Sequence, residues 1–380
     1  MKRPAFRLAA SWLPAAALGL VLGLTACSSA PERPAPTPLA QLTPQFSVRQ
    51  AWRLDIGPTE ASVQAWSRGD RLAVANAQGL LLVIDAATGQ ERWRLPLGTP
   101  VTAGVGGDGE RFALVTRANE LVVAENGKVL WRQRLGALST TAPLVAGGRV
   151  FVLTADRSVS AFDAQDGRRL WSQGRNTDPL VLRRPGLLMA MGDTLLAGLS
   201  GRLVALNPDT GQLRWEVPVG TSRGTNEIER LVDVVAGVHR DGPVVCARAF
   251  QAAVSCIDTR RGQVLWTRSA QGHEGLSGDA QNVYGVESDG RLRAWARSSG
   301  EPVWQYEGLR FRGVGSPALS GRSLVVGDAQ GVLHWFSADK GEPQSRVVPD
   351  GSALLMPPVQ AGNTLVAITA NGAVVGYRPQ

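Results

Sequence analysis

Cysteine, histidine, methionine and tyrosine are all scarce in this chain of 380 residues, which contains three Cys, three His, four Met and three Tyr. Three cysteines are too few for a scaffold built from disulfide bonds. His239, His273 and His334 lie far apart and not at the spacing of metal ligands, so the sequence predicts no metal site. The chain also lacks helical periodicity and a glycine-rich loop leading into a helix, which excludes a phosphate-binding loop of the nucleotide-binding type.

The first 26 residues instead have the layout of a secretion signal. Lys2, Arg3 and Arg7 form a positive start, and residues 8–26 are almost wholly apolar and uncharged. The alternative is an uncleaved anchor helix, but proline and glycine interrupt the apolar stretch and a polar segment follows it directly. We therefore expect residues 1–26 to be removed.

The end of this signal resembles the lipobox of bacterial lipoproteins, with Leu24-Thr25-Ala26 before Cys27. The resemblance implies a mature chain that begins at a lipidated Cys27 and is anchored by several acyl chains. Ser28 follows the cysteine, where Asp would imply retention in the inner membrane. Ser28 therefore implies that the lipoprotein is transferred to the outer membrane of a Gram-negative bacterium, where it lies at the periplasmic face.

Residues 27–44 are rich in proline and predict an extended tether without a core of its own. The formal net charge of the whole chain is +8, and residues 1–26 carry three positive and no negative charges. The mature charge of about +5 is modest and keeps a protein soluble. We expect no nucleic-acid partner.

The remainder, residues 45–380, is one repeat that is marked by tryptophan. Seven tryptophans are separated by 41, 38, 40, 44, 51 and 38 residues, and Ser345 stands near the next expected position. These residues are Trp52, Trp93, Trp131, Trp171, Trp215, Trp266 and Trp304. A glycine lies four residues before most of them, often with Asp or Asn four residues earlier, as in D-A-A-T-G-Q-E-R-W at 85–93.

Two short aliphatic runs precede each motif and are separated by Gly, Asn or Asp, which is typical of a β-hairpin. Residues 72–75 and 80–84 are one such pair, and a third strand, 91–95, carries the tryptophan. With a further short strand, each unit of about 40 residues matches one blade of a β-propeller. The length of 45–380 predicts eight blades, with seven as the alternative.

The ends of the chain are expected to complete one blade together. Residues 47–54 supply a tryptophan strand with nothing before it, and residues 373–377 end the chain without one. Pairing of these two runs would close the ring and remove an open sheet edge. In each motif we expect the glycine to adopt a positive φ and the tryptophan to pack on a neighbouring blade rather than on a ligand.

The D-x-x-T-G-x-x-x-W unit resembles the tryptophan-docking motif of pyrroloquinoline-quinone (PQQ) propellers over residues 45–380. Two families share this motif, the quinoprotein alcohol dehydrogenases and the BamB lipoproteins of the outer-membrane β-barrel assembly (BAM) machinery. The dehydrogenases are longer and have adjacent cysteines over the quinone and a calcium site of carboxylates. Here Cys246 and Cys256 are ten residues apart and no such carboxylate cluster is found. The resemblance to BamB therefore implies a non-enzymatic chain without a cofactor, with a PQQ-dependent periplasmic dehydrogenase as the alternative.

Two extra loops carry residues that match the BamB family. The first loop matches an L-x-L-R segment at Leu180, Leu182 and Arg183. The second matches an E-I-x-R-L-x-D-V segment at Glu227, Ile228, Arg230, Leu231, Asp233 and Val234. The family often has a second acid where Val235 stands here. The resemblance implies that these loops grip the barrel subunit BamA.

In this interpretation, Leu182 and Arg183 form an apolar anchor with a bidentate donor, and Asp233 supplies a complementary charge or orients Arg230. The alternative is that Leu180 and Leu182 belong to an ordinary strand of blade four and that Arg183 is solvated. The implied partners are BamA, other BAM subunits and unfolded outer-membrane proteins, with the membrane contacted through the lipid. A propeller that binds a glycan or lipid is a third class, which no residue specifically supports.

Cys246 and Cys256 flank one predicted hairpin. In an oxidising periplasm they could form a disulfide across the two strands. The alternative is a pair of inert buried thiols, because the register of the hairpin decides whether the two side chains face each other.

Overall fold

The computed structural model describes residues 34–60, 63–174, 182–221, 232–354 and 356–379. Residues Pro36–Gln380 form one compact unit, separate from Met1–Ala35. The described residues form strands and turns, and they include no helix of the length and hydropathy that a membrane crossing requires. The predicted signal and Cys27 lie outside these residues.

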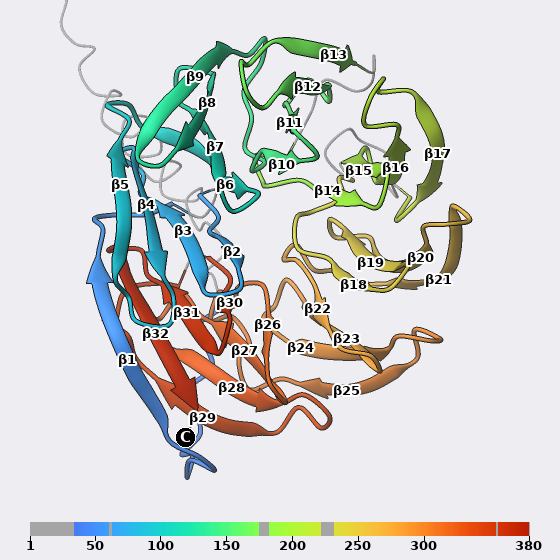
Figure 1. Cartoon of the computed structure of the whole chain (residues 1–380). Helices are drawn as coiled ribbons and strands as arrows, with labels where there is room; N and C mark the ends of the chain where they lie inside the picture. The colour runs from blue at the N-terminus through green and yellow to red at the C-terminus, as the bar shows by residue number, and fades with distance from the viewer. Residues whose placement is uncertain (1–33, 61–62, 175–181, 222–231, 355, 380) are drawn as a thin grey trace, which may run out of the picture. The chain divides into compact units, whose positions relative to one another are not determined.

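Eight antiparallel sheets of four strands make up the propeller, and Figure 1 shows them arranged around a common centre. Blade 1 consists of β2 (Trp66–Arg68), β3 (Arg71–Ala75), β4 (Leu80–Asp85) and β5 (Glu91–Pro96), and blade 2 consists of β6 (Val101–Gly107), β7 (Arg111–Thr116), β8 (Glu120–Glu125) and β9 (Lys128–Arg134). Blade 3 consists of β10 (Leu144–Ala146), β11 (Arg149–Leu153), β12 (Val159–Asp163) and β13 (Arg169–Gln173), and blade 4 consists of β14 (Leu188–Met191), β15 (Thr194–Leu199), β16 (Arg202–Leu206) and β17 (Leu213–Pro218).

Blade 5 consists of β18 (His239–Asp241), β19 (Val244–Ala249), β20 (Ala253–Asp258) and β21 (Gln263–Ser269), and blade 6 consists of β22 (Ser277–Gly278), β23 (Asn282–Val286), β24 (Leu292–Ala296) and β25 (Pro302–Tyr306). Blade 7 consists of β26 (Ala318–Ser320), β27 (Ser323–Gly327), β28 (Leu333–Ser337) and β29 (Pro343–Val347), and blade 8 consists of β30 (Val359–Ala361), β31 (Thr364–Ile368), β32 (Ala373–Pro379) and β1 (Val48–Asp55). The first strand of each blade is the innermost, and the last is the outermost (Figure 1). The predicted hairpins and tryptophan strands are confirmed.

The two ends of the chain close the ring in blade 8. β1 pairs with β32 in antiparallel register from Val48 opposite Pro379 to Asp55 opposite Ala373, with one irregularity between Gln50 and Trp52. The predicted count of eight blades and the predicted closure are therefore confirmed, and the alternative of seven blades is wrong. β32 lies between β31 and β1, so the C-terminal strand has a partner on both sides and is not an edge of the sheet.

At seven of the eight blade junctions, a docking tryptophan of one blade lies against a glycine of the next. The indole N–H of Trp171 in β13 donates to the carbonyl oxygen of Pro208 in blade 4, at 2.9 Å. The six-membered ring of Trp171 lies over Gly211, where an added Cβ would come within 2.6 Å of it. Gly211 also has a φ of +73°. This position therefore requires glycine for two reasons, because a Cβ would meet the ring and because the backbone is left-handed. The same arrangement recurs, for example, between Trp131 and Gly167.

The core consists of the apolar layers between neighbouring blades. One such layer joins Val83 of β4 to Phe112 and Val122 of blade 2, and all three side chains are buried. Trp93 packs on this layer and meets Phe112 edge-on, with ring centroids 5.5 Å apart. Consecutive residues of β4 and β8 are buried, because each strand presents alternate side chains to the blade on either side.

Candidate partner-binding site

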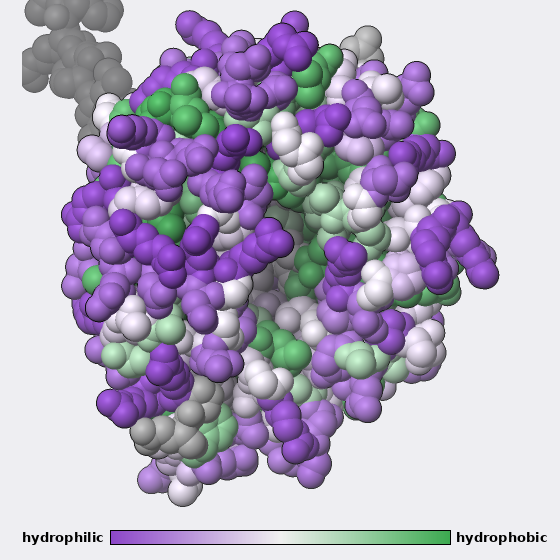
Figure 2. Space-filling model, viewed as in Figure 1, coloured by the Kyte–Doolittle hydropathy of each residue, from purple (hydrophilic) through white to green (hydrophobic). Residues whose placement is uncertain are grey.

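Strand direction decides which loops share a face of the propeller. Neighbouring strands of each blade are antiparallel, so the turns between the second and third strands lie on the same face as the connections between blades. We call this the mouth face. Six inter-blade connections line a central funnel on this face. Each contributes one of the following residues: Gln64, Arg183, Val235, Glu274, Gly315 and Pro357. Figure 2 shows a hollow at the centre of the ring, with polar residues over much of the surrounding surface.

Both loops singled out in the sequence are inter-blade connections on the mouth face. Residues 182–187 form the part of the β13–β14 connection that directly precedes β14. Residues 232–238 form the part of the β17–β18 connection that directly precedes β18. The two connections pair with each other, because Ala236 N–H donates to the carbonyl of Pro185 at 2.9 Å and Gly186 forms a β-bridge with Val235. Leu180, Glu227 and Arg230 lie outside the described residues.

Asp233 is the centre of this junction. Its carboxylate accepts the backbone N–H of Leu182 at 3.3 Å and lies 3.6 Å from a guanidinium nitrogen of Arg157. Arg157 comes from the turn between β11 and β12 and adopts a φ of +60°, which is uncommon for a residue with a side chain. The backbone carbonyl of Asp233 accepts from Phe250 N–H in blade 5 at 2.8 Å. Asp233 thus joins blades 3, 4 and 5.

Arg183 and Arg184 are neighbours in sequence but differ in their surroundings. Arg184 donates to Glu274 at 2.9 Å, and Glu274 also accepts from the hydroxyl of Ser316 at 2.8 Å. Arg183 is exposed and has no hydrogen bond or ion pair with any residue that the structure describes. Arg184 therefore links three of the connections that line the funnel, whereas the Arg183 side chain is exposed.

Leu182 and Val235 show how the apolar part of this junction is arranged. Leu182 is half-buried and lines a pocket together with Leu153, Leu199 and Asp233. Val235 is buried, and its N–H donates to the carbonyl of Arg248 at 3.1 Å. The position at which the family often has a second acid is therefore part of the core here and presents no charge to the funnel.

Sequence reasoning missed Arg157 and Glu274, which hold the two connections in place. Arg157 belongs to an ordinary hairpin turn, T-A-D-R, and Glu274 to the connection between β21 and β22. His273, beside Glu274, is half-buried, and burial lowers its pKa although the Glu274 carboxylate opposes the shift. No local pattern distinguishes these residues, because their roles depend on contacts between different blades.

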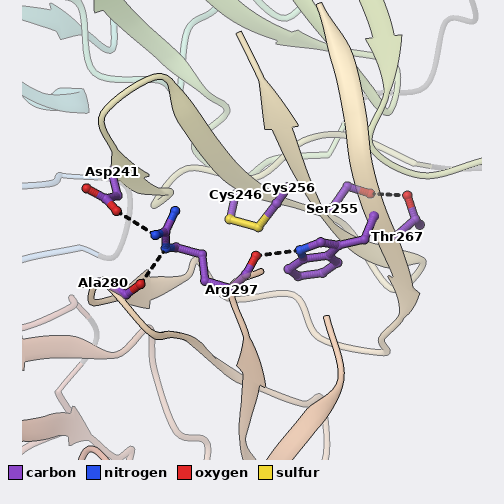
Figure 3. The surroundings of a disulfide bond; sticks show 8 residues. Asp241, Cys246, Ser255, Cys256, Thr267, Ala280 and Arg297 are labelled. Atoms are coloured by element: carbon purple, nitrogen blue, oxygen red, sulfur yellow. Dashed lines mark hydrogen bonds and ion pairs between the residues drawn. A yellow bond between two sulfur atoms is a disulfide. The ribbon is translucent and has the colours of Figure 1, made fainter. Parts of the chain in front are cut away.

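A disulfide joins Cys246 of β19 to Cys256 of β20 (Figure 3). The two residues are directly opposite each other in the register of the hairpin, and both side chains are fully buried. Figure 3 also shows Arg297 of blade 6 between Asp241, at 2.9 Å, and the carbonyl of Ala280. The bridge lies within the layer between blades 5 and 6 and away from the lining of the funnel.

The residues of the funnel do not fit the quinone and calcium of the dehydrogenase family. Within the described ranges, no group of three or more His, Cys, Asp or Glu side chains is close enough to hold a metal ion. The funnel carboxylate of Glu274 is already paired with Arg184 and Ser316. Cys246 and Cys256 are joined across strands rather than adjacent, so they could not form the contact with a quinone that the resemblance implies.

The known proteins to which this chain is similar include assembly factors of the outer membrane. A family model described as outer membrane protein assembly factor BamB matches residues 47–102 and 77–306. The chain is 37% identical to BamB of Burkholderia pseudomallei over 97% of its own length and 98% of that protein. It is 31% identical to BamB of Bordetella pertussis over 97% of both chains.

Solved structures confirm the propeller fold. The crystal structure of BamB from Moraxella catarrhalis superimposes with a TM-score of 0.80 and 24% identity, covering 87% of this chain and 100% of that one. The quinohemoprotein alcohol dehydrogenase of Comamonas testosteroni has a TM-score of 0.66 at 14% identity, covering 87% of this chain and 76% of that one. The second likeness is one of fold alone.

Proposed function

This chain belongs to the family of outer membrane protein assembly factor BamB, and on that premise we propose that it is a non-enzymatic scaffold for outer-membrane protein assembly. Its partner would be the periplasmic part of a BamA-like barrel subunit in a BAM complex. By holding that subunit it would assist the insertion of β-barrel proteins. Unfolded barrel proteins are further candidate ligands, through the exposed edges of the outer strands.

The observation that carries the proposal is that Leu182 and Arg183 lie next to each other in one connection at the junction of two blades. Leu182 is held by Asp233 through its backbone, whereas the Arg183 guanidinium is exposed and unpaired among the described residues. An apolar side chain next to a free bidentate donor is a favourable composition for a binding hot spot. Because Asp233 and Arg157 fix the backbone, little conformational entropy remains to be lost on binding.

The lipid anchor is a second part of the proposal. We propose that Cys27 carries the acyl chains and holds the protein at the periplasmic face of the outer membrane, as the L-T-A-C motif and Ser28 imply. Mass spectrometry of the mature N-terminus would test this, since cleavage before Cys27 and acylation each change the mass. Retention of residues 1–26 would contradict it.

We propose no catalytic role for the chain. A dehydrogenase would need residues for the quinone and its metal, and the described funnel offers Glu274 only within its bonds to Arg184 and Ser316. Purified protein mixed with PQQ and Ca²⁺ should therefore give no spectral change and no reduction of dye with alcohols or sugars.

A pull-down from detergent-solubilised envelope tests the partner. Wild type should recover a large barrel protein, and Leu182→Ala/Arg183→Ala should lose most of it. A matched control is Leu213→Ala/Arg214→Ala, which removes the same residue types from the outer strand β17, where Leu213 is 51% exposed. Circular dichroism and melting temperature would establish that all three proteins are folded. Equal recovery by wild type and both variants would exclude this site.

A further inference from the structure

The segment Thr37–Gln45, which we call the strap, lies against the outside of the propeller ahead of its first strand. Thr37 N–H donates to the carbonyl of Arg310 at 3.0 Å, and the carbonyl of Thr37 accepts from Arg312 at 3.2 Å. Further along, the carbonyl of Ala40 accepts from Arg346 at 2.8 Å. Gln45 N–H then donates to the carbonyl of Gln344 at 2.8 Å. The strap is therefore bound along its length, although its composition predicts only an extended chain.

An apolar contact supports these hydrogen bonds. Leu39 is half-buried and packs on the layer that contains Leu309, Tyr306 and Phe336, between blades 6 and 7. The strap thus has an apolar anchor near its start as well as polar contacts at both ends.

The Thr37 end of the strap is held by a rigid side chain. Arg312 is buried, and its Nε donates to Asp328 at 2.6 Å. Asp328 is fully buried and lies 3.0 Å from His334 Nε2, so the guanidinium is fixed from behind. Arg312 therefore offers its remaining nitrogen to Thr37 from a preorganised position.

The strap begins at the mouth face. Arg310 and Arg312 belong to the connection between β25 and β26, and Gly313–Ser316 of that connection line the same funnel as Arg183. From there the strap follows the edge strand β29 in the opposite direction, from Arg346 back to Gln344, and then enters β1. Thr37, the first residue of the strap, therefore lies at the face that carries the candidate partner site.

We propose that the strap orients the propeller on a lipid surface, with the mouth face directed toward the membrane. The proposal rests on the lipidation of Cys27 proposed above. Ten residue steps separate Cys27 from Thr37, so these two residues can lie at most about 35 Å apart. Without the strap, the 21 steps to Val48 would allow about 70 Å. Binding of the strap halves the reach and selects one face.

Energy transfer between the protein and lipid tests this orientation. The full lipoprotein would be reconstituted in phosphatidylethanolamine/phosphatidylglycerol vesicles that contain an acceptor lipid. A donor would be attached through Gln330→Cys, in the mouth-face turn between β27 and β28, or through Arg322→Cys, in the turn on the opposite face of the same blade. Both positions are exposed, so the two labels differ only in the face that they report.

We expect higher transfer from the label at 330 than from the label at 322. Leu39→Ser/Arg346→Ala should release the strap and abolish this difference. The matched control Leu130→Ser/Arg134→Ala changes the same residue types on the exposed outer strand β9 and should preserve it. Equal transfer from the two labels in the wild type, or a difference that survives release of the strap, would overturn the proposal.

Two further measurements separate the strap from the lipid anchor. Vesicle flotation of wild type against Cys27→Ser reports anchoring alone, and failure of the wild type to float would reject the anchor and the orientation together. Hydrogen exchange reports the strap alone: the amides of Thr37 and Gln45 should be protected in wild type and lose protection in Leu39→Ser/Arg346→Ala. Unprotected amides in wild type would reject the strap whatever the lipid state.

Discussion

The carboxylate of Asp233 lies 3.3 Å from the backbone nitrogen of Leu182, and this contact joins two connections that are 51 residues apart in the chain. The same carboxylate is 3.6 Å from Arg157, whose side chain is 8% exposed. Asp233 therefore positions the candidate site without being its most exposed member. A variant at Asp233 should consequently change the placement of Leu182 and Arg183 while leaving both side chains present.

Asp233→Ala should weaken recovery of the barrel partner and lower the free energy of unfolding. The Leu182 N–H loses its acceptor, and loss of a hydrogen bond to a charged group costs about 1.5–3 kcal/mol. Urea denaturation would measure the stability, and the envelope pull-down would measure binding. Asp193→Ala is the control, because the Asp193 side chain is 83% exposed and its ion pair with Arg214 is screened by solvent, so its loss should have little effect on stability. Unchanged recovery with Asp233→Ala would remove this residue from the site.

Gly211→Ala should destabilise the propeller more than Gly192→Ala. Both glycines have a positive φ, +73° and +58°, so both variants incur the cost of a left-handed residue, roughly 1–2 kcal/mol. Only at Gly211 does the new Cβ meet a ring, 2.6 Å from Trp171, whereas nothing lies within 4 Å at Gly192. The overlap should add about 1–3 kcal/mol. Denaturation curves of the two variants would give the difference, and equal losses would show that the tryptophan does not pack on the glycine in solution.

Removal of the disulfide by Cys246→Ala/Cys256→Ala should lower the free energy of unfolding by about 2–4 kcal/mol, because the cross-link restricts the unfolded chain. Both cysteines are fully buried, so dithiothreitol should not reduce the bridge in the folded protein. Thiol labelling with and without urea would test access to the bridge. The double variant also serves as the control for reductant. It has no bridge to reduce, so its denaturation curve should be the same with and without dithiothreitol. Labelling of the native wild type after mild reduction would contradict the buried position.

The repeat could be predicted from sequence because its signals are local. The glycine with positive φ, the turn carboxylate and the tryptophan recur within nine residues, as in 85–93, where Asp85 accepts the N–H groups of Ala87 and Thr88. The length of residues 45–380, compared with the length of one unit, then predicted the number of blades. The facing positions of Cys246 and Cys256 could not be derived, because they depend on the hairpin register that the folded blade adopts.

Contacts between distant segments could not be predicted in this way. The resemblance identified Leu182, Arg183 and Asp233, but the partners that hold them, Arg157 and Arg184–Glu274, come from turns without a distinguishing pattern. The strap is a similar case, since proline content predicts an extended chain but not the surface on which it lies. Closure of the ring brings these segments together, so their contacts depend on the whole fold.

The stability of the protein should fall as the pH decreases from 7 to 5, partly because of His334. Burial lowers the pKa of His334, and the nearby Arg346 and Arg312 act in the same direction, although Asp328 opposes them. Burial alone would raise the pKa of Asp328, but hydrogen bonds from His334, Val332 N–H and Arg312 outweigh it and hold that pKa below its usual range. The lowered pKa favours the neutral imidazole of His334 at pH 7, and its Nε2, 3.0 Å from the Asp328 carboxylate, is placed to donate a hydrogen bond to it.

The sign of the effect follows from the proton that the unfolded chain binds. An unfolded histidine titrates near pH 6.5, so below that pH the unfolded state gains a proton that the folded state does not, and unfolding becomes more favourable. The slope contributed by one histidine is at most about 1.4 kcal/mol per pH unit. His334→Gln keeps a donor for Asp328 but does not titrate, so its unfolding free energy should fall less between pH 7 and 5. Burial also lowers the pKa values of His239 and His273, which should leave a residual slope in this variant. Equal slopes for wild type and His334→Gln in urea denaturation at pH 7, 6 and 5 would show that His334 is protonated alike in both states.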